Sequence, residues 1–159
     1  MQTKIVMQPV TRRTLMAFAG AGAVATLTGA LLPGLARADA KAVADSIKKL
    51  IGDKTPKSGR IALELPQIAE NGNTVPIALE VESPMTETDY VKAVHVFADQ
   101  NPNPDVATFR FTSASGKAKV STRMRMIKTQ NVIALAEMSD GSIYMAKAEV
   151  KVTIGGCGG

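Results

Sequence analysis

The sequence is poor in the residues that build most metal and cofactor sites. Its 159 residues include one cysteine, one histidine and no tryptophan, and aromatic residues make up 4% of the chain. No spacing of Cys and His matches a zinc site, and no glycine-rich loop matches a phosphate-binding motif. An internal disulfide is excluded, because Cys157 has no second cysteine to pair with. We therefore expect no bound cofactor and no metal.

The first forty residues have the three parts of an export signal. Arg12 and Arg13 form an adjacent pair, residues 15–32 are apolar, and "ARADA" offers cleavage after Ala38 or Ala40. The arginine pair is typical of a twin-arginine signal, which exports proteins already folded, and Sec export is the alternative. The apolar stretch is just long enough for a membrane anchor. Its dilution by Gly, Thr and Ala, together with the cleavage site, favours a signal that is removed and a periplasmic protein.

Removal of this segment changes the charge of the protein. The full chain has a formal net charge of +5, and residues 1–40 hold four basic residues against one acidic residue. That segment carries +3, so about +2 remains on residues 41–159. The mature chain shows no clustered Lys and Arg interleaved with aromatic residues, which excludes a nucleic-acid footprint. Its length of about 119 residues is typical of one domain.

Hydrophobic periodicity predicts one short helix and then a series of strands. The helix follows a candidate N-cap at Asp39 and stops at Gly52. Alternation with a period of two then predicts about seven strands, at residues 61–65, 74–82, 90–98, 106–112, 117–126, 131–138 and 142–154. Turn signals such as Asn71-Gly72 and Asn101-Pro102 separate them. Because no helices intervene, we expect a mainly antiparallel, immunoglobulin-like β-sandwich over residues 41–154.

Four residues in these strands bear on packing. Pro76 cannot donate to a β-ladder, which predicts that its strand lies at an edge. Residues 90–98 are apolar on both faces, which predicts a central strand. His95 lies in this strand, and we interpret it as a hydrogen-bonded packing residue rather than as a ligand or base. Met124 and Met126 lie on an apolar face and are interpreted as core residues, with a partner-facing surface as the alternative.

The sequence ends in "VKVTIGGCGG", and the alternation of the last strand stops at Ile154. Cys157 is flanked by glycines on both sides, namely Gly155, Gly156, Gly158 and Gly159. Glycine has the largest backbone freedom and no side chain to pack, so we expect residues 155–159 to form a flexible arm. At ~3.3–3.6 Å per residue, the thiol would reach roughly 10 Å from Ile154. Such an arm is thin enough to enter a narrow channel of another protein.

The surroundings of Cys157 in the sequence offer nothing that would activate its thiol. An unperturbed cysteine has a pKa of about 8.5, and Lys151 is the nearest basic residue. We therefore expect a passive thiol that other proteins act on, and we assign no catalytic residue. Three alternatives stay open: an intermolecular disulfide that crosslinks a structural module, a thiol enzyme with a base beside Cys157, and a carrier activated at its terminal glycine carboxylate like the ubiquitin-like sulfur carriers.

Taken together, the leader, the short helix, a sandwich of about 110 residues and the terminal "VKVTIGGCGG" resemble the SoxY family. These are the sulfur carrier subunits of the bacterial thiosulfate-oxidising (Sox) system. The resemblance implies that Cys157 is the covalent attachment site for the substrate, as a cysteine S-thiosulfonate. It spans nearly the whole chain, although the strand region matches only in pattern and length.

The resemblance also implies a set of partners. The carrier would form a heterodimer with a second small β-sandwich, SoxZ. A c-type cytochrome enzyme (SoxAX) would couple thiosulfate to the thiol, and a dimanganese hydrolase (SoxB) would release sulfate. In systems with a sulfane dehydrogenase (SoxCD), the remaining sulfur would be oxidised on the arm. The chain itself would then be a substrate carrier and not an enzyme.

Overall fold

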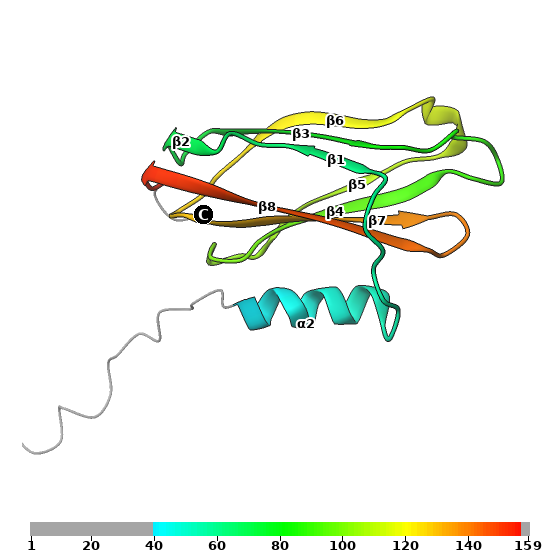
Figure 1. The fold of residues 1–159 in the computed structure, drawn as a ribbon, viewed down its shortest axis with the longest axis horizontal. Coiled ribbons are helices and arrows are strands. Elements are labelled where there is room, and N and C mark those ends of the chain that lie inside the picture. The colour runs from blue at the N-terminus through cyan, green and yellow to red at the C-terminus, as the bar shows by residue number, and fades with distance from the viewer. Residues whose placement is uncertain (1–39, 157–159) are drawn as a thin grey trace, which may run out of the picture. The chain divides into compact units, whose positions relative to one another are not determined.

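The computed structural model describes residues 40–156, which form one α-helix followed by eight strands (Figure 1). The export signal, the candidate N-cap Asp39 and the residues Cys157, Gly158 and Gly159 lie outside the described residues. In the described part, no helix is both long enough and apolar enough to cross a membrane.

Helix α2 (Ala40–Ile51) confirms the predicted helix and its stop. Gly52 has a φ of 63°, and its amide donates a hydrogen bond of 2.8 Å to the carbonyl of Lys48. A left-handed glycine is a common end for a helix, because the conformation is free of Cβ strain. The apolar face of α2 packs Val43 against Phe97 and other residues on the outer face of the larger sheet.

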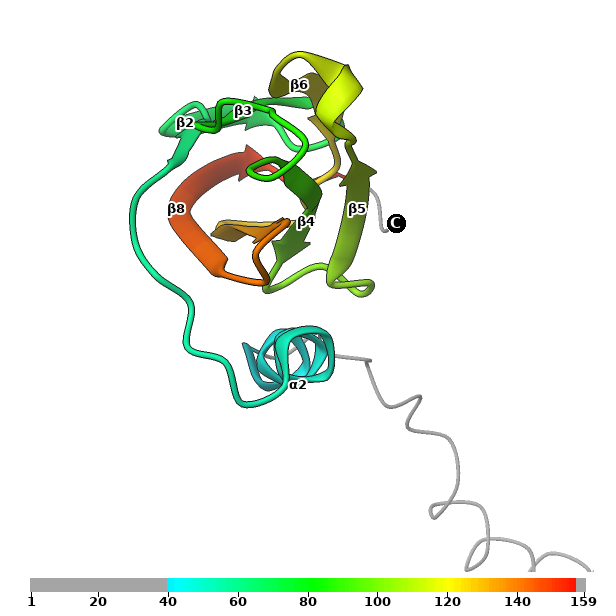
Figure 2. The same ribbon diagram turned by 90° about the vertical axis from the view of Figure 1, so that its right-hand side faces the viewer.

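The strands form two sheets that stack on each other (Figures 1 and 2). The smaller sheet has the order β1-β3-β6 and contains β1 (Ile61–Glu64), β3 (Val75–Val81) and β6 (Ala118–Met124). The larger sheet has the order β2-β8-β7-β4-β5 and contains β2 (Ile68–Asn71), β8 (Ile143–Ile154), β7 (Gln130–Met138), β4 (Val91–Ala98) and β5 (Asp105–Arg110). Helix α2 lies on the side of the larger sheet that faces away from the smaller one (Figure 2). This arrangement confirms the predicted immunoglobulin-like sandwich.

The main core lies between the two sheets. Its most deeply buried members are large apolar side chains, among them Val75, Leu79, Val94, Met126, Val132, Met138 and Val150. At roughly 25 cal/mol per Å² of apolar surface, each contributes on the order of 2 kcal/mol relative to an exposed position. Met124 and Met126 are 5% and 0% exposed, which confirms the interpretation of both as packing residues.

Strand β4 shows why the sequence is apolar on both of its faces. It is hydrogen-bonded to β7 on one side and to β5 on the other, so it is an interior strand of the sheet, as the pattern predicts. Val94 and Val96 point into the main core, whereas Phe97 packs in the second cluster beneath α2. A strand covered on both faces needs apolar residues at nearly every position.

The structure corrects two predictions about the strands. It has eight strands and not about seven, because Ile68–Asn71 forms an additional strand, β2, which pairs with β8 in parallel. The prediction that Pro76 marks an edge strand is wrong, since β3 lies between β1 and β6. The pairing of β1 with β3 ends at Ala78, however, so Pro76 lies where the β1 side of β3 has no partner.

Candidate functional site

The candidate site is the glycine motif at the end of β8. Cys157, Gly158 and Gly159 lie outside the described residues, but Gly155 and Gly156 are described. These two glycines meet two other segments, the turn between β2 and β3 and the segment that follows β6. The described part of the site is therefore the backbone of Gly155 and Gly156, which leads to Cys157.

A series of backbone hydrogen bonds joins these three segments. The amide of Gly72 donates to the carbonyl of Ile154 at 2.8 Å, and the amide of Met126 donates to the carbonyl of Gly72 at 2.7 Å. The amide of Gly156 in turn donates to the carbonyl of Met126 at 2.9 Å. Both backbone groups of Met126 are thus satisfied by glycines, one in the turn and one in the motif.

Three glycines at this place make contacts that any other residue would block. A Cβ atom on Gly72 would lie 2.1 Å from the carbonyl oxygen of Met126, and one on Gly155 would lie 2.1 Å from that of Ile127. A Cβ atom on Gly156 would lie 2.9 Å from both the carbonyl oxygen of Gly72 and Cγ of Arg125. We call Gly72, Gly155 and Gly156 the glycine clamp, since they are close-packed backbone rather than left-handed turns.

Two residues of the predicted arm, Gly155 and Gly156, belong to the glycine clamp. Gly156 is buried and hydrogen-bonded, and Gly155 lies against the backbone of Ile127. A missing side chain permits close contact as readily as it permits motion. The flexibility of the whole arm, residues 155–159, stays a prediction.

A side-chain network supports the segment that the motif rests on. Half-buried Asn101 donates from Nδ2 to the carbonyl of Arg125 at 2.7 Å. Its Oδ1 accepts from the amide of Ile127 at 3.2 Å and from Nε2 of Gln130 at 2.8 Å. Met126, between the two bonded residues, is fully buried in the main core. In the sequence, Asn101 and Gly72 are recognisable only as turn signals, and no pattern indicates that they meet the motif.

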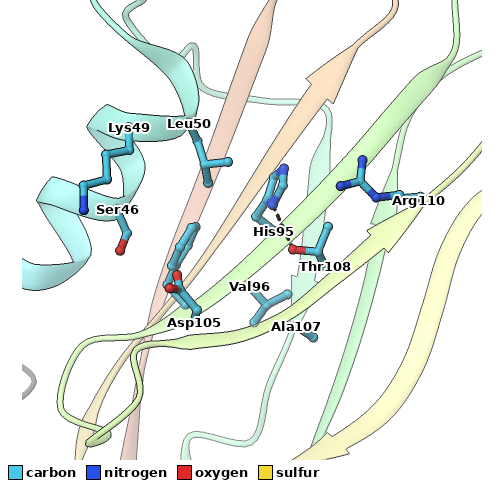
Figure 3. A pocket seen from close by; sticks show the side chains of 10 residues that line it. Ser46, Lys49, Leu50, His95, Val96, Asp105, Ala107, Thr108 and Arg110 are labelled. Atoms are coloured by element: carbon cyan, nitrogen blue, oxygen red, sulfur yellow. Dashed lines mark hydrogen bonds between the residues drawn. The ribbon is translucent and has the colours of Figure 1, made fainter.

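His95 lies at a different place, under α2, beside a cavity of about 480 Å³ (Figure 3). It is 8% exposed, its Nδ1 is 3.0 Å from Oγ1 of Thr108, and its ring stacks on Phe97. This confirms the interpretation of His95 as a hydrogen-bonded packing residue. Burial lowers the pKa of His95 below 6.5, because the charged imidazolium is poorly solvated there, and Arg110 acts in the same direction.

The cavity is lined by groups of mixed charge. Lys49 from α2 and Arg110 and Asp105 from β5 surround it, with His95 beneath them (Figure 3). Among residues 40–156, no three His, Cys, Asp or Glu side chains gather in a way that would hold a metal ion. None of the residues that line the cavity belongs to the glycine clamp.

The fold and the motif define the class of protein: a small immunoglobulin-like sandwich that ends in a glycine-flanked cysteine. A family model described as "Sulfur oxidation protein SoxY" matches residues 47–157. The solved structure of the sulfur carrier protein SoxY from Chlorobium limicola f thiosulfatophilum is 33% identical, covers 73% of this chain and all of its own, and has a TM-score of 0.61. The chain belongs to the SoxY family of sulfur oxidation proteins.

Other solved structures share only the fold. A superoxide reductase (neelaredoxin) from Ignicoccus hospitalis is 15% identical, with coverage of 59% of this chain and 80% of its own and a TM-score of 0.53. A putative superoxide reductase from Thermotoga maritima is 18% identical, with 61% and 93% coverage and a TM-score of 0.51. A search of curated proteins gave no match. At this identity the superoxide reductases show the sandwich and nothing of the chemistry.

Proposed function

We propose that this protein is a covalent carrier of sulfur intermediates and that Cys157 is the attachment site. The observation that carries the proposal is the extent of the family match, which runs through the sandwich and ends on Cys157. The similar structure from Chlorobium limicola is itself described as a sulfur carrier protein, and its whole length is covered. The glycine clamp supports the same reading, because it fixes the backbone directly before the thiol.

The chemistry of loading follows from the atoms involved. Joining the cysteine sulfur to the outer sulfur of thiosulfate forms one S–S bond, releases the thiol proton and removes two electrons. The sequence contains no cofactor-binding motif that would supply a redox group for those electrons, so we assign the oxidation to a c-type cytochrome partner of the SoxAX kind. The product is a cysteine S-thiosulfonate, which carries one negative charge.

Release of sulfate needs no further oxidant. Water attacks the terminal sulfone, the S–S bond to that sulfone breaks, and a persulfide remains on Cys157. We assign this hydrolysis to a dimanganese enzyme of the SoxB kind, and oxidation of the remaining sulfur, where it occurs, to a SoxCD-like dehydrogenase. The protein is in this view a substrate carrier in the periplasm, exported by its twin-arginine-type signal and paired with a SoxZ-like subunit.

The experiment is intact-mass analysis of the protein purified from cells grown on thiosulfate. We expect masses that correspond to sulfur and thiosulfate adducts, all removed by a reductant and all absent from the Cys157→Ser variant. That variant should also lose thiosulfate oxidation. Free thiol as the sole species, together with an active Cys157→Ser variant, would refute the proposal.

An intermolecular disulfide through Cys157 is the alternative function, since the chain has a single cysteine. The two proposals differ in which species is active. If the protein is a carrier, the disulfide-linked dimer seen on a non-reducing gel should be inactive until it is reduced. If activity instead follows the amount of dimer, the protein is a crosslinked structural module.

A further inference from the structure

The cavity under α2 has a cation at one end and a carboxylate at the other. In the pairing of β4 with β5, Arg110 lies opposite Ala93. Asp105 lies opposite Phe97, four residues further along β4. At ~3.3 Å per residue, the two positions are roughly 13 Å apart along the strand. Arg110 and Asp105 therefore mark the two ends of the cavity, and His95 lies between them (Figure 3).

A β-bulge brings Asp105 to this cavity. Simple alternation from Thr108 along β5 would place Val106 on the face under α2 and Asp105 on the opposite face. The pairing instead shifts by one residue between Val96 and Phe97. Val106 consequently packs against the main core, and Asp105 lines the cavity. Bulges that redirect a side chain are common beside functional sites.

His95 directs one ring nitrogen to β5 and leaves the other toward the cavity. Its Nδ1 is 3.0 Å from Oγ1 of Thr108. With that hydroxyl as the donor, the neutral ring carries its proton on Nε2, and the imidazolium carries one there in either case. Among the described residues, no hydrogen bond holds Nε2, and no fully buried side-chain nitrogen lacks a partner. The Nε2–H is therefore reached from the cavity, although the residue as a whole is only 8% exposed.

The guanidinium of Arg110 is turned toward the ring of His95 (Figure 3). Burial is the main cause of the lowered pKa of His95, and the positive charge of Arg110 adds to it, as expected for a cation beside the ring. In the described part of the chain, no ion pair includes Arg110. A guanidinium fork and an imidazole N–H that face each other across open space form a set of donors that suits an oxyanion.

The other charged groups around the imidazole favour an anion at this end of the cavity. Glu137 of β7 is paired with Lys92 of β4 at 3.7 Å, so its charge is largely balanced. Lys49 of α2 lines the cavity and adds a second positive charge. Asp105 repels an anion from the far end. The end at Arg110 is therefore the positive one.

We propose that Arg110 and His95 form a binding site for a small oxyanion such as thiosulfate, sulfate or a carboxylate. The guanidinium pairs with two oxygens of the anion, and Nε2–H of His95 donates to it as well. The cavity of about 480 Å³ has room for such an anion together with water. No covalent bond forms and Cys157 takes no part, so the site goes beyond the proposed function and does not depend on it.

The test follows the ring resonances of His95, which is the only histidine of the chain. The mature protein carries Cys157→Ser, so that thiosulfate cannot react covalently. Thiosulfate, sulfate and acetate are titrated separately against a ¹H–¹⁵N spectrum of the ring, with chloride at equal ionic strength as the reference. We expect a saturating shift that chloride does not produce, with a dissociation constant in the millimolar range. Binding should be tighter below pH 6.5 than above it, because the anion stabilises the imidazolium.

Three variants test the residues of the site. Arg110→Gln, which loses the charge, should weaken binding about 10-fold. Arg123→Gln is the matched control, because it removes the same charge from an exposed arginine of β6 in the smaller sheet, and it should leave the affinity within about 2-fold of the reference protein. Asp105→Asn should strengthen binding about 3-fold, since a repelling carboxylate is lost. A gain in affinity cannot arise from loss of folding.

The three anions distinguish the sources of the ligand. Tightest binding of thiosulfate would assign the site to the substrate of the proposed carrier, of sulfate to the released product, and of acetate to an organic acid; each of these results supports an oxyanion site. A shift no larger than that of chloride, or equal losses in Arg110→Gln and Arg123→Gln, would overturn the inference. Because these samples lack the thiol of Cys157, failure of the carrier proposal shows in the mass experiment alone.

Discussion

Two groups of positions in this domain require glycine for opposite structural reasons. Gly52 and Gly116 have φ angles of 63° and 72°, and a Cβ atom added to either would have no neighbour within 4 Å. The glycine clamp shows the reverse, since its members have no positive φ but no room for a Cβ atom. The first group is glycine for its backbone conformation, and the second for its lack of volume.

This difference changes the meaning of the terminal motif. A glycine-rich segment is usually interpreted as flexible, because the sequence alone does not distinguish a mobile glycine from a close-packed one. Here the two glycines before Cys157 are hydrogen-bonded and in contact with backbone. In the described part of the chain, the backbone is therefore in contact with the domain as far as Gly156.

The largest effect is expected for Gly72→Ala. Its added methyl group would meet two backbone atoms, the carbonyl oxygen of Met126 at 2.1 Å and the amide nitrogen of Gly156 at 2.6 Å. Gly72 lies inside the chain between two strands, so the clash requires a backbone shift. We expect a loss of about 3 kcal/mol in the free energy of unfolding, measured by urea denaturation.

Gly52→Ala is the control for that substitution. A Cβ atom on Gly52 meets open space, and alanine there adds only the cost of a left-handed residue, about 1 kcal/mol. Equal losses for Gly72→Ala and Gly52→Ala would mean that the two groups of glycines do not differ in the way described above.

Asn101→Ala should come next in size. The substitution removes the hydrogen bonds to Arg125, Ile127 and Gln130 together. We expect a loss of about 1–3 kcal/mol in the free energy of unfolding, since backbone groups of a half-buried segment lose their hydrogen-bond partners. The Gly156 amide should also exchange faster with solvent deuterium, because the segment that accepts its hydrogen bond is no longer held by the side chain of Asn101. Full protection of that amide in the variant would contradict the supporting role of Asn101.

A smaller effect is expected for Gly155→Ala. Its clash with Ile127 is as close as that of Gly72 with Met126, but Gly155 follows the end of β8, so its contacts can be lost while the strands stay paired. The loss is then limited to the contacts of the motif, about 1 kcal/mol of unfolding free energy. Hydrogen exchange at the Gly156 amide should increase while the rest of the domain keeps its protection. A loss as large as that of Gly72→Ala would show that the motif cannot separate from the sandwich.

The smallest effect concerns pH and lies away from the glycine clamp. Burial lowers the pKa of His95 in the folded state, so the unfolded chain binds a proton more readily. Stability from this residue is fully present above pH 6.5 and is lost as the pH falls through 6.5 toward the folded pKa, with a slope of at most about 1.4 kcal/mol per pH unit. His95→Gln should flatten this slope. The rate of hydrogen exchange at the Gly156 amide, corrected for its intrinsic pH dependence, should change in the variants of the glycine clamp. It should stay unchanged in His95→Gln.

Much of the sandwich could be predicted from the sequence, because its strands follow simple rules. Strand β4 is apolar on both faces since α2 covers one and the smaller sheet covers the other. The helix ends at Gly52, where a left-handed residue is needed. These features depend on local pattern and on burial, which a single sequence records directly.

The errors arose where the structure depends on contacts far apart in the chain. Strand β2 has four residues, and of these Ile68 is 61% exposed, so no alternating pattern marks it. Pro76 predicts an edge for the whole of β3, but β3 lacks a partner on the β1 side only around Pro76, while Pro76 itself pairs with Arg123 of β6. The glycine clamp joins three segments that are about thirty or more residues apart in the chain, and no pattern in one of them indicates the others.

The short parallel strand β2 has a mechanical consequence for the end of the chain. Strand β8 lies between β7 and β2, and residues close to its end, including Ile154, are paired with β2. A pull on residue 157 along the axis of β8 would load the hydrogen bonds on both sides in shear rather than opening them one at a time. An enzyme could therefore draw strongly on the end of this chain without unravelling the strand that bears it.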